Sequence, residues 1–448
     1  MRMSKKQIFR GLIVCVLAVG LAGQLWSQRV GFTKEEFAQR RAKLMETVGD
    51  GVIILFGAVE QPPAGHFRQD NDFYYYTGVE DAGAVVLMVP KFKKSALYLP
   101  TQPPKEIEFV GQNLLADPKG KEKSGFGDIR PLEQFDMALA RFSGRNLGPM
   151  YVRLSPADKV DGSRYETAMA NARRSQLHYN SMMSLDQYRI QRLKERYPAY
   201  QFKDLAPIID RQRMIKTPEE IEVLRRNGRI SALSVLAAMK ATKPGALEYQ
   251  LEAEALYISQ RNGALGPAYS PIVGSGPNAC VYHYTRNDRK LQNGDLVLMD
   301  YGANLDSLCI DITRTWPANG TFTEEQKKVY QAVLEVEKAC IEAYKPGVTG
   351  KDVRAHVEKV MKEKGLDPLG LKGGIGHFVG LATHDVGVYG LPLEAGMVFA
   401  IEPALYYRDT NTCIRVEDTV LITKDGCEVL TSAVPKELEE IEAVMRER

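Results

Sequence analysis

Four carboxylates in the second half of the sequence lie within apolar, strand-like segments: Asp300, Asp311, Glu402 and Glu417. Asp300, for example, ends the apolar run 296–299, and Asp311 stands between Ile310 and Ile312. A carboxylate buried in such a segment has to be paired or bound to a metal, because burying an isolated charge is costly. Few basic residues stand beside these four in the sequence, so a pair of divalent cations is the simplest way to balance their charge.

An imidazole completes the candidate ligand set, which is Asp300, Asp311, His377, Glu402 and Glu417. Four carboxylates and one imidazole favour manganese, cobalt, iron or zinc over a thiolate-bound ion or a calcium cage. Two such ions, about 3.5 to 4 Å apart, can activate a water molecule and polarise a carbonyl group. Two further histidines, His283 and His384, stand in the same segments. The sequence therefore predicts a metal-dependent hydrolase.

Each of these residues alone has an ordinary structural explanation as a cap, a surface group or a core histidine, but the five together do not. The glycine-rich segments 274–276 and 373–376 complete no dinucleotide-binding or Walker motif. No GxSxG motif occurs, which argues against a serine hydrolase.

The candidate ligands fall in an internal repeat of about 100 residues. Thr217, Pro218 and Glu220 predict a capped helix that ends near 243–245. Thr323 opens a second capping box, on a helix predicted to end near 345–347. A second helix and β-rich segments follow each of these helices, so we expect an α/β domain with a pseudo-twofold axis, to which each copy contributes ligands.

The first half of the sequence predicts a separate mixed α/β domain. Short apolar runs at 51–56, 84–89 and 96–99 indicate strands, and 164–203 has a helical composition. The aromatic stretch Phe73 to Tyr76 is interpreted as core packing. A polar connection near 210–216 places the boundary, giving predicted domains at 29–210 and 211–448.

Residues 1–28 are typical of a signal peptide. Four basic residues precede an apolar run of about a dozen residues, which is shorter than the roughly 20 that a membrane span needs. Without the segment, 55 basic residues face 56 acidic ones. We therefore expect an exported protein without a stable membrane anchor and without a nucleic-acid partner, since the sequence has no basic stripe.

Five cysteines remain after residue 28, and none has CxxC spacing: Cys280, Cys309, Cys340, Cys413 and Cys427. One or two disulfides are possible in an exported protein, but mostly buried free thiols are the favoured interpretation.

Several short strings resemble one metallopeptidase family: His283-Tyr284-Thr285, Asp300-Tyr301-Gly302, Asp311-Ile312-Thr313-Arg314-Thr315, Gly376-His377-Phe378-Val379-Gly380, His384-Asp385-Val386-Gly387, Ile401-Glu402-Pro403 and Arg415-Val416-Glu417-Asp418. They resemble the proline-specific branch of the pita-bread metallopeptidases, which contains Xaa-Pro aminopeptidase and prolidase. The resemblance covers about 210–435 and extends more weakly into 67–78. It implies a pita-bread catalytic domain behind a creatinase-like amino-terminal domain.

The resemblance also implies a role for each residue. Asp300 would chelate the first metal ion, Asp311 and Glu417 would bridge both ions, and His377 and Glu402 would hold the second. Glu402 would also act as the general base toward a bridging hydroxide. His283 and His384 would bind the substrate carbonyl and the developing oxyanion or help to protonate the leaving nitrogen, and Arg415 would orient the carboxylates.

Two positions depart from the family pattern. Gly373 stands where relatives commonly carry a further histidine, which affects a substrate contact rather than metal binding, and Ala404 stands where glycine often follows the Glu-Pro pair.

We expect an aminopeptidase that acts on proline-containing peptides and uses two divalent ions, manganese being favoured. The resemblance alone implies a homo-oligomer. The alternatives are a prolidase limited to Xaa-Pro dipeptides and, from another class, a non-catalytic peptide-binding protein or a metal-free hydrolase of the creatinase type.

Overall fold

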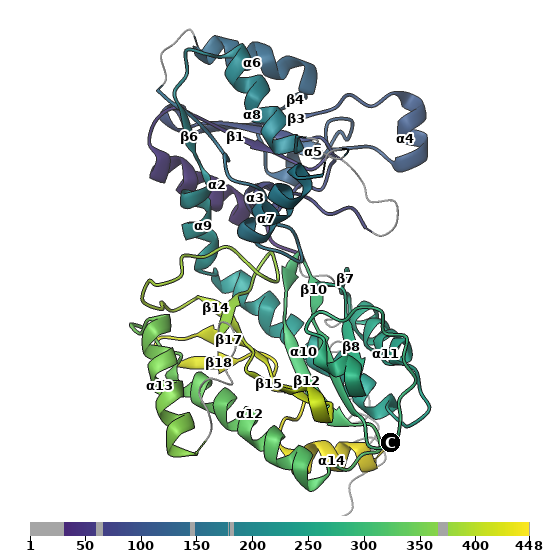
Figure 1. Ribbon diagram of the computed structural model, residues 1–448. Coiled ribbons are helices and arrows are strands. Elements are labelled where there is room, and N and C mark those ends of the chain that lie inside the picture. The colour runs from purple at the N-terminus through teal and green to yellow at the C-terminus, as the bar shows by residue number, and fades with distance from the viewer. Residues whose placement is uncertain are drawn as a thin grey trace, which may run out of the picture.

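The computed structural model describes residues 31–59, 66–143, 148–177, 179, 183–365 and 375–447. The expected signal segment 1–28 and Gly373 lie outside the described residues. Figure 1 shows an amino-terminal part above a carboxy-terminal part, with helices α9 (Ala206–Met214) and α10 (Pro218–Ala241) leading from one to the other.

A six-stranded mixed sheet organises the amino-terminal part. Its strand order is β4-β3-β2-β1-β5-β6. The strands are β1 (Val52–Phe56), β2 (Val85–Val89), β3 (Lys94–Leu99), β4 (Ile129–Pro131), β5 (Met150–Val152) and β6 (Phe202–Asp204). β1, β2 and β3 pair antiparallel, whereas β4, β5 and β6 join in parallel. The three predicted strands are confirmed as β1, β2 and β3.

Helices cover both faces of this sheet. Side chains of β1 alternate, so that Ile53 and Leu55 pack with α2 (Lys34–Val48) and α3 (Asn71–Thr77). Val52 and Ile54 pack on the other face with α6 (Phe135–Ser143) and α8 (Leu185–Arg196). The remaining helices of this part are α4 (Pro104–Val110), α5 (Gly120–Ser124) and α7 (Arg164–Ser175).

The aromatic stretch at 73–76 forms most of α3. Asp70 caps the helix by accepting a hydrogen bond from the Phe73 backbone N–H. Phe73, Tyr75 and Tyr76 are buried in the core, so the interpretation of this stretch as packing is confirmed.

The predicted polar connection at 210–216 is largely helical, and residue 210 lies inside α9. Ile209 and Met214 are fully buried, and Arg213 is buried among carboxylates. The charges of this connection, which look solvated in the sequence, are neutralised by partners far away in the chain. The domain boundary near this connection stays a prediction.

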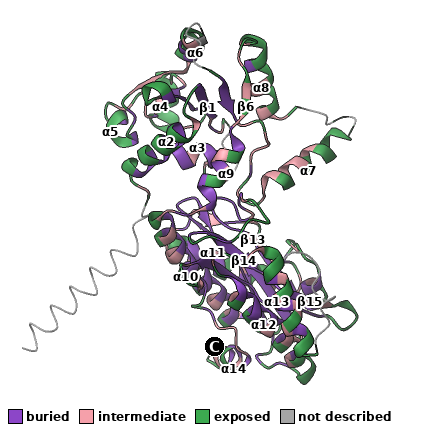
Figure 2. Cartoon of the chain, turned by 90° about the vertical axis from the view of Figure 1, so that its left-hand side faces the viewer, coloured by how far each residue is buried: buried purple, intermediate pink, exposed green. Residues whose placement is uncertain are grey.

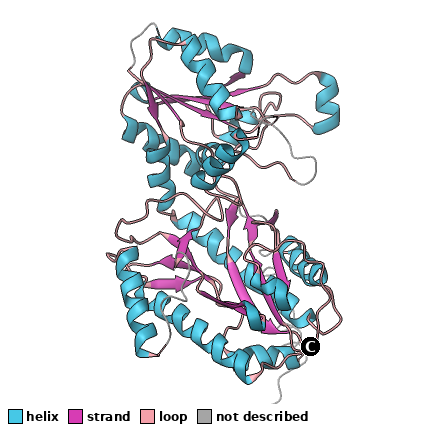
Figure 3. Ribbon diagram, viewed as in Figure 1, coloured by secondary structure: helices cyan, strands magenta, loops and turns pink. Residues whose placement is uncertain are grey.

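The carboxy-terminal part repeats one arrangement twice. The first copy contains the helix pair α10 and α11 (Glu248–Arg261), and the second contains α12 (Glu324–Ala343) and α13 (Gly350–Glu363). Both predicted capping boxes are present, at Thr217 for α10 and at Thr323 for α12. Figure 3 shows these helices outside and the strands between them.

Each copy contributes an antiparallel sheet, in the orders β12-β9-β8 and β13-β14-β17-β18. The first contains β8 (Ile272–Ser275), β9 (Leu296–Tyr301) and β12 (Ile312–Pro317). The second contains β13 (Gly376–Phe378), β14 (Val398–Ile401), β17 (Asp418–Ile422) and β18 (Cys427–Val429). Three smaller units complete this part. One is a hairpin of β15 (Ala404–Tyr407) and β16 (Thr412–Arg415), and another is a small sheet of β7 (Gly266–Pro267), β10 (Ala303–Leu305) and β11 (Leu308–Cys309). The third is helix α14 (Leu438–Arg446).

The buried residues follow the strands of both parts, and the helices expose their outer faces, as Figure 2 shows. One continuous apolar cluster runs from Leu44 and Ile53 through Ile209 to Leu224 and Val297, so the two parts share a core. Among the described residues, no helix has both the length and the hydropathy of a membrane span.

Candidate metal centre

Three buried carboxylates from the two copies of the repeat converge between their sheets. Asp300 lies in β9, Asp311 directly precedes β12, and Glu417 directly precedes β17. One ligand oxygen from each lies within 4.8 Å of the others. Asp311 and Glu417 occupy matching places, because each directly precedes a strand that pairs antiparallel with an inner strand of its sheet, β12 with β9 and β17 with β14.

Hydrogen bonds across the two copies hold these carboxylates in register. The Glu417 backbone N–H donates to the Thr313 carbonyl (3.0 Å), and the Asp311 N–H donates to the Thr419 hydroxyl (3.1 Å). The Thr313 hydroxyl donates to Oε2 of Glu417 (2.6 Å). The centre therefore needs both copies docked together.

His377, in β13, adds the imidazole. Its Nε2 lies 3.4 Å from Oδ2 of Asp311 and 3.8 Å from Oε1 of Glu402, which directly follows β14. Its Nδ1 lies 3.1 Å from the Phe378 carbonyl oxygen. Because a carbonyl oxygen can only accept, the Nδ1 proton belongs to this bond, and Nε2 is the nitrogen that can bind a metal ion. The structure thus brings together all five residues of the predicted ligand set.

Electrostatics at the centre show an excess of negative charge. Burial raises the pKa of Asp300 to about 7, with Asp311 adding to the rise and Arg415 opposing it. Burial and the neighbouring carboxylates raise the pKa of Glu417 well above its usual value. At His377, burial lowers the pKa, but the hydrogen bond with Asp311 and the charge of Glu402 raise it to about 9. Four carboxylates thus share the site with one guanidinium and one imidazole, and this donor set fits divalent cations.

Arg415, predicted to orient the carboxylates, lies beside Asp300. Its Nη2 donates to Oδ2 of Asp300 (2.5 Å), and its Nη1 donates to the Tyr406 hydroxyl (2.9 Å). Its Nε donates to the Thr313 hydroxyl (2.9 Å), which in turn bonds Glu417. The Arg415 guanidinium thus binds Asp300 directly and is linked to Glu417 through the Thr313 hydroxyl.

Tyr269 is a site residue that the sequence did not indicate. Its buried hydroxyl lies within hydrogen-bond reach of both Asp300 and Asp311. The residue stands in a loop before β8, where nothing in the local pattern distinguishes it from a packing tyrosine. Thr313 could have been found, because it lies two residues after Asp311 and so faces the same side of β12.

The structure places the two further histidines differently. The His384 ring lies 4.2 Å from the His377 ring, and the two histidines and Asp311 form a second group that could hold a metal ion. His283 lies on an exposed turn, with its ring 6.2 Å from that of Tyr282. Within the described residues no hydrogen bond joins His283 to the carboxylates, so its contact with substrate stays a prediction.

The amino-terminal part also reaches the centre. Oε1 of Glu166, in the first turn of α7, lies 2.8 Å from Nδ1 of His384. The hydrogen bond with His384 is the largest influence on Glu166 and lowers the pKa of its carboxyl to about 2. Glu166 was not predicted as a site residue, because a capping-box glutamate is an ordinary helix feature.

One disulfide, between Cys280 and Cys413, crosses the two copies near the centre. Cys280 ends the 3₁₀ turn η3 (Gly276–Cys280), and Cys413 lies in β16, two residues before Arg415. Cys309 and Cys340 are buried free thiols, and Cys427 is a partly exposed one. Three of the five cysteines are thus free, and the remaining two are paired.

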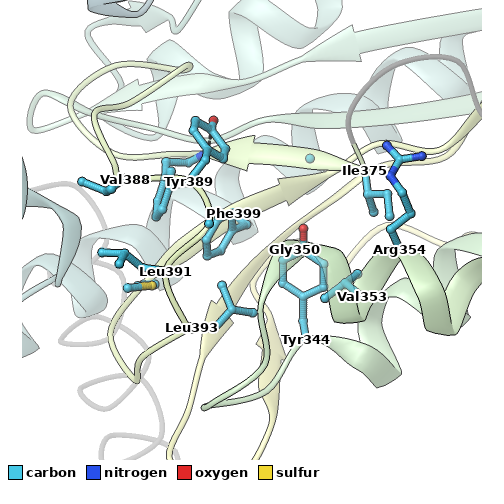
Figure 4. Close-up of a pocket in the computed structure, with 14 residues that line it drawn as sticks. Tyr344, Gly350, Val353, Arg354, Ile375, Val388, Tyr389, Leu391, Leu393 and Phe399 are labelled. Atoms are coloured by element: carbon cyan, nitrogen blue, oxygen red, sulfur yellow. Dashed lines mark hydrogen bonds between the residues drawn. The ribbon is translucent and has the colours of Figure 1, made fainter.

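A cavity of about 380 Å³ lies on the reverse side of β13 (Figure 4). Gly376 and Phe378 line it, whereas His377 between them faces the carboxylates, as expected for alternating side chains. Tyr344, Leu393 and Phe399 provide much of its apolar wall. The cavity is therefore separate from the metal centre.

Comparisons with known proteins agree with this architecture. Residues 222–424 match the model of metallopeptidase family M24, and residues 37–148 match that of the aminopeptidase P N-terminal domain. The Xaa-Pro aminopeptidase of Escherichia coli (strain K12) is 35% identical over 92% of this chain and 98% of its own. The Xaa-Pro dipeptidase of Pongo abelii is 30% identical over 91% of this chain and 93% of its own.

The fold gives the same result. A solved structure of aminopeptidase P from E. coli in a low-pH form superposes with a TM-score of 0.78 at 31% identity and covers 93% of this chain and 99% of its own. The predicted pairing of an amino-terminal domain with a pita-bread domain is confirmed. The chain therefore belongs to metallopeptidase family M24, in the branch of the Xaa-Pro aminopeptidases and Xaa-Pro dipeptidases.

Proposed function

We propose that this chain is an exported Xaa-Pro aminopeptidase, which releases the residue that precedes proline at the amino terminus of a peptide. Membership of its branch makes it a metal-dependent, proline-specific exopeptidase. One observation carries the proposal: five side chains from both copies of the repeat converge at one centre, namely Asp300, Asp311, His377, Glu402 and Glu417. The carboxylates of this centre carry more negative charge than the neighbouring protein cations balance.

The dinuclear centre of the family fits these five residues. Asp300 would bind the first ion, Asp311 and Glu417 would bridge, and His377 and Glu402 would bind the second. When bound, two divalent cations lower the pKa of water and polarise the scissile carbonyl. The surrounding residues keep the ligands in place: Arg415 and Tyr269 bond Asp300, and Thr313 bonds Glu417.

Protein groups would carry the proton steps. We assign Glu402 as the general base, because its side chain is partly exposed at the edge of the centre and can exchange protons with solvent. His384, beside His377, would bind the substrate carbonyl or protonate the leaving nitrogen, and His283 would assist from its exposed turn. Proline's tertiary amide has no N–H, so a site shaped around the ring and activated by metal suits this bond.

Manganese is the proposed physiological metal, with cobalt, iron or zinc as the other ions that the donor set allows. We expect near-stoichiometric divalent metal in protein purified without chelators. Asp311→Ala should lose both metal and peptidase activity, because Asp311 joins the two candidate metal-binding groups. Asp409→Ala, on an exposed turn outside the centre, is the matched control. Metal-free wild-type protein that retains full activity would contradict the proposal.

Peptide length separates the aminopeptidase from the alternative, a dipeptidase. Relatives with both names align over more than 90% of this chain, so the shared ligand set does not discriminate. Cleavage of Gly-Pro and of a longer Xaa-Pro peptide should be compared in the presence of manganese. We expect cleavage of the longer peptide; cleavage of the dipeptide alone would make the chain a prolidase.

Export, oligomeric state and domain bounds complete the proposal. The charged and apolar layout of residues 1–28 supports export, as does a disulfide, which persists in oxidising compartments. Amino-terminal sequencing of the mature protein tests for cleavage of the segment, and light scattering tests for the proposed homo-oligomer. The proposed bounds, 29–210 and 211–448, can be tested by limited proteolysis.

A further inference from the structure

The imidazole of His384 is held from the other domain. Its Nδ1 lies 2.8 Å from Oε1 of Glu166, which stands 218 residues earlier in the chain. We propose that Glu166 is a positioning residue for His384, so that the amino-terminal domain fixes the orientation and tautomer of a histidine at the metal centre. The inference rests on the proposed function in one respect, namely that His384 takes part in peptide cleavage.

The chemistry of the contact assigns the proton. An ionised carboxylate has only lone pairs to offer, so the hydrogen of this bond lies on Nδ1 of His384. The other ring nitrogen, Nε2, is left to exchange a proton or a hydrogen bond with the substrate. A carboxylate behind a catalytic imidazole commonly fixes its tautomer in this way.

Glu166 has one oxygen committed to its own helix and one to His384. Its Oε2 accepts hydrogen bonds from the Ser163 backbone N–H (2.7 Å) and hydroxyl (2.9 Å), which completes the capping box of α7. Both oxygens are therefore bound, and the side chain is held in one orientation. Hydrogen bonds to both carboxylate oxygens distinguish Glu166 from a surface glutamate that forms a single exposed ion pair.

The first turn of α7 is itself anchored. Arg164 forms ion pairs with Asp72 (2.9 Å), Asp158 (3.2 Å) and Asp210 (2.7 Å). Asp72 and Asp158 are buried. Because Arg164 is only two residues from Glu166, the buried carboxylates fix the position from which Glu166 reaches across.

The segment that carries His384 is anchored on its other side. Asp385 accepts hydrogen bonds from Arg213 (2.5 Å) and from Lys216 (3.0 Å). The Thr383 backbone N–H donates to the Val160 carbonyl (2.8 Å). Hydrogen bonds therefore hold Thr383 and Asp385, the residues on both sides of His384. The contact with Glu166 then determines the orientation of the His384 ring.

An NMR measurement tests the contact without any reference to activity. In zinc-loaded protein with ¹⁵N-labelled histidine, long-range ¹H–¹⁵N spectra distinguish the two tautomers, and His384→Ala identifies the signal among the six histidines. We expect His384 to carry its proton on Nδ1 in the wild type and to lose this preference in Glu166→Ala. A wild-type proton on Nε2, or a spectrum that Glu166→Ala leaves unchanged, would overturn the proposal.

A kinetic cycle tests the consequence. Glu166→Ala should lower kcat by about tenfold to a hundredfold with little change in KM, and Glu166→Gln, which keeps an acceptor oxygen, should recover part of the loss. In a His384→Ala background, Glu166→Ala should cost nothing more, because the interaction is already gone. An equal loss in both backgrounds would mean that Glu166 acts through stability alone.

The matched control is Asp352→Ala. Asp352 is the corresponding capping-box carboxylate of α13 and accepts hydrogen bonds only from Thr349 among the described residues. Its loss should leave kcat unchanged. If the wild type cleaves no Xaa-Pro bond, the proposed function fails, while the NMR result still decides whether Glu166 fixes His384.

Discussion

Replacing both Cys280 and Cys413 by serine should destabilise the carboxy-terminal domain by about 5 kcal/mol, the value expected when a cross-link of this span is removed from the unfolded chain. The disulfide joins residues 133 positions apart. Such a link restricts the unfolded chain far more than the folded one, and the cost of closing a loop grows with the logarithm of its length.

The disulfide lies in the packed seam between the two copies of the repeat. Ile272, Leu298 and the two cysteines form a small buried apolar cluster there. Beside it, the Tyr282 ring packs on Tyr406, with ring centroids 4.9 Å apart. Serine would also bury two hydroxyl groups in this cluster, which adds to the destabilisation.

Tryptophan fluorescence provides a direct assay. The sequence has two tryptophans, so a chain that begins at residue 29 retains only Trp316, which is fully buried in β12. With a urea dependence of about 2 to 3 kcal/mol per molar, the unfolding midpoint should fall by about 2 M. A reductant should lower the midpoint of the wild type in the same way but somewhat less, because it introduces no buried hydroxyl group.

The control is reductant added to the double serine variant, which retains the three free thiols and should show no further change. A midpoint shift below about 0.5 M, in the variant and in the reduced wild type alike, would refute the reasoning. It would mean that packing between the two copies already restricts the chain as much as the cross-link does.

Two further predictions concern buried charges. Arg213→Met should cost about 3 to 5 kcal/mol in urea unfolding, because it removes one cationic partner from each of three buried carboxylates, Asp72, Asp158 and Asp385. Arg211→Met, in the same helix but in an exposed ion pair, should cost less than about 1 kcal/mol. Burial and Asp418 raise the pKa of Glu337 to about 8. Between pH 4.5 and about 8, Glu337 is therefore protonated in the folded state and ionised in the unfolded state. The free energy of unfolding consequently falls as the pH rises through this range. The decline in Tm between pH 5 and 8.5 should be smaller in Glu337→Gln; an equal decline would contradict this account.

The sequence predicted features that local patterns encode. The capping boxes at Thr217 and Thr323 determine where helices begin, and apolar runs locate the central strands. The four carboxylates of the predicted ligand set were singled out because an acidic residue inside an apolar run contradicts its surroundings. Residues whose role depends on distant partners were not found: Tyr269 and Glu166 look like a packing tyrosine and a helix cap until the fold brings Asp311 and His384 beside them.

The disulfide shows the same limit. Nothing in the spacing of the five cysteines selects Cys280 and Cys413, because their proximity is a product of the docking of the two copies. The helical structure and burial within the polar connection at 210–216 were not predicted, for a related reason. Arg213 is buried, but the carboxylates that allow its burial come from residues 72, 158 and 385.

These contacts also connect the amino-terminal domain to the candidate metal centre. Residues 377–385 carry both histidines of the centre, and the other domain contacts this stretch at several points. Arg68 donates to the Leu381 carbonyl, and Val160 accepts from Thr383. The five predicted ligands come from the carboxy-terminal repeat, but the loop that carries His384 contacts both domains. If His384 acts in peptide cleavage as proposed, peptidase activity should depend on the docking of the two domains, although the amino-terminal domain contributes no metal ligand to the predicted set.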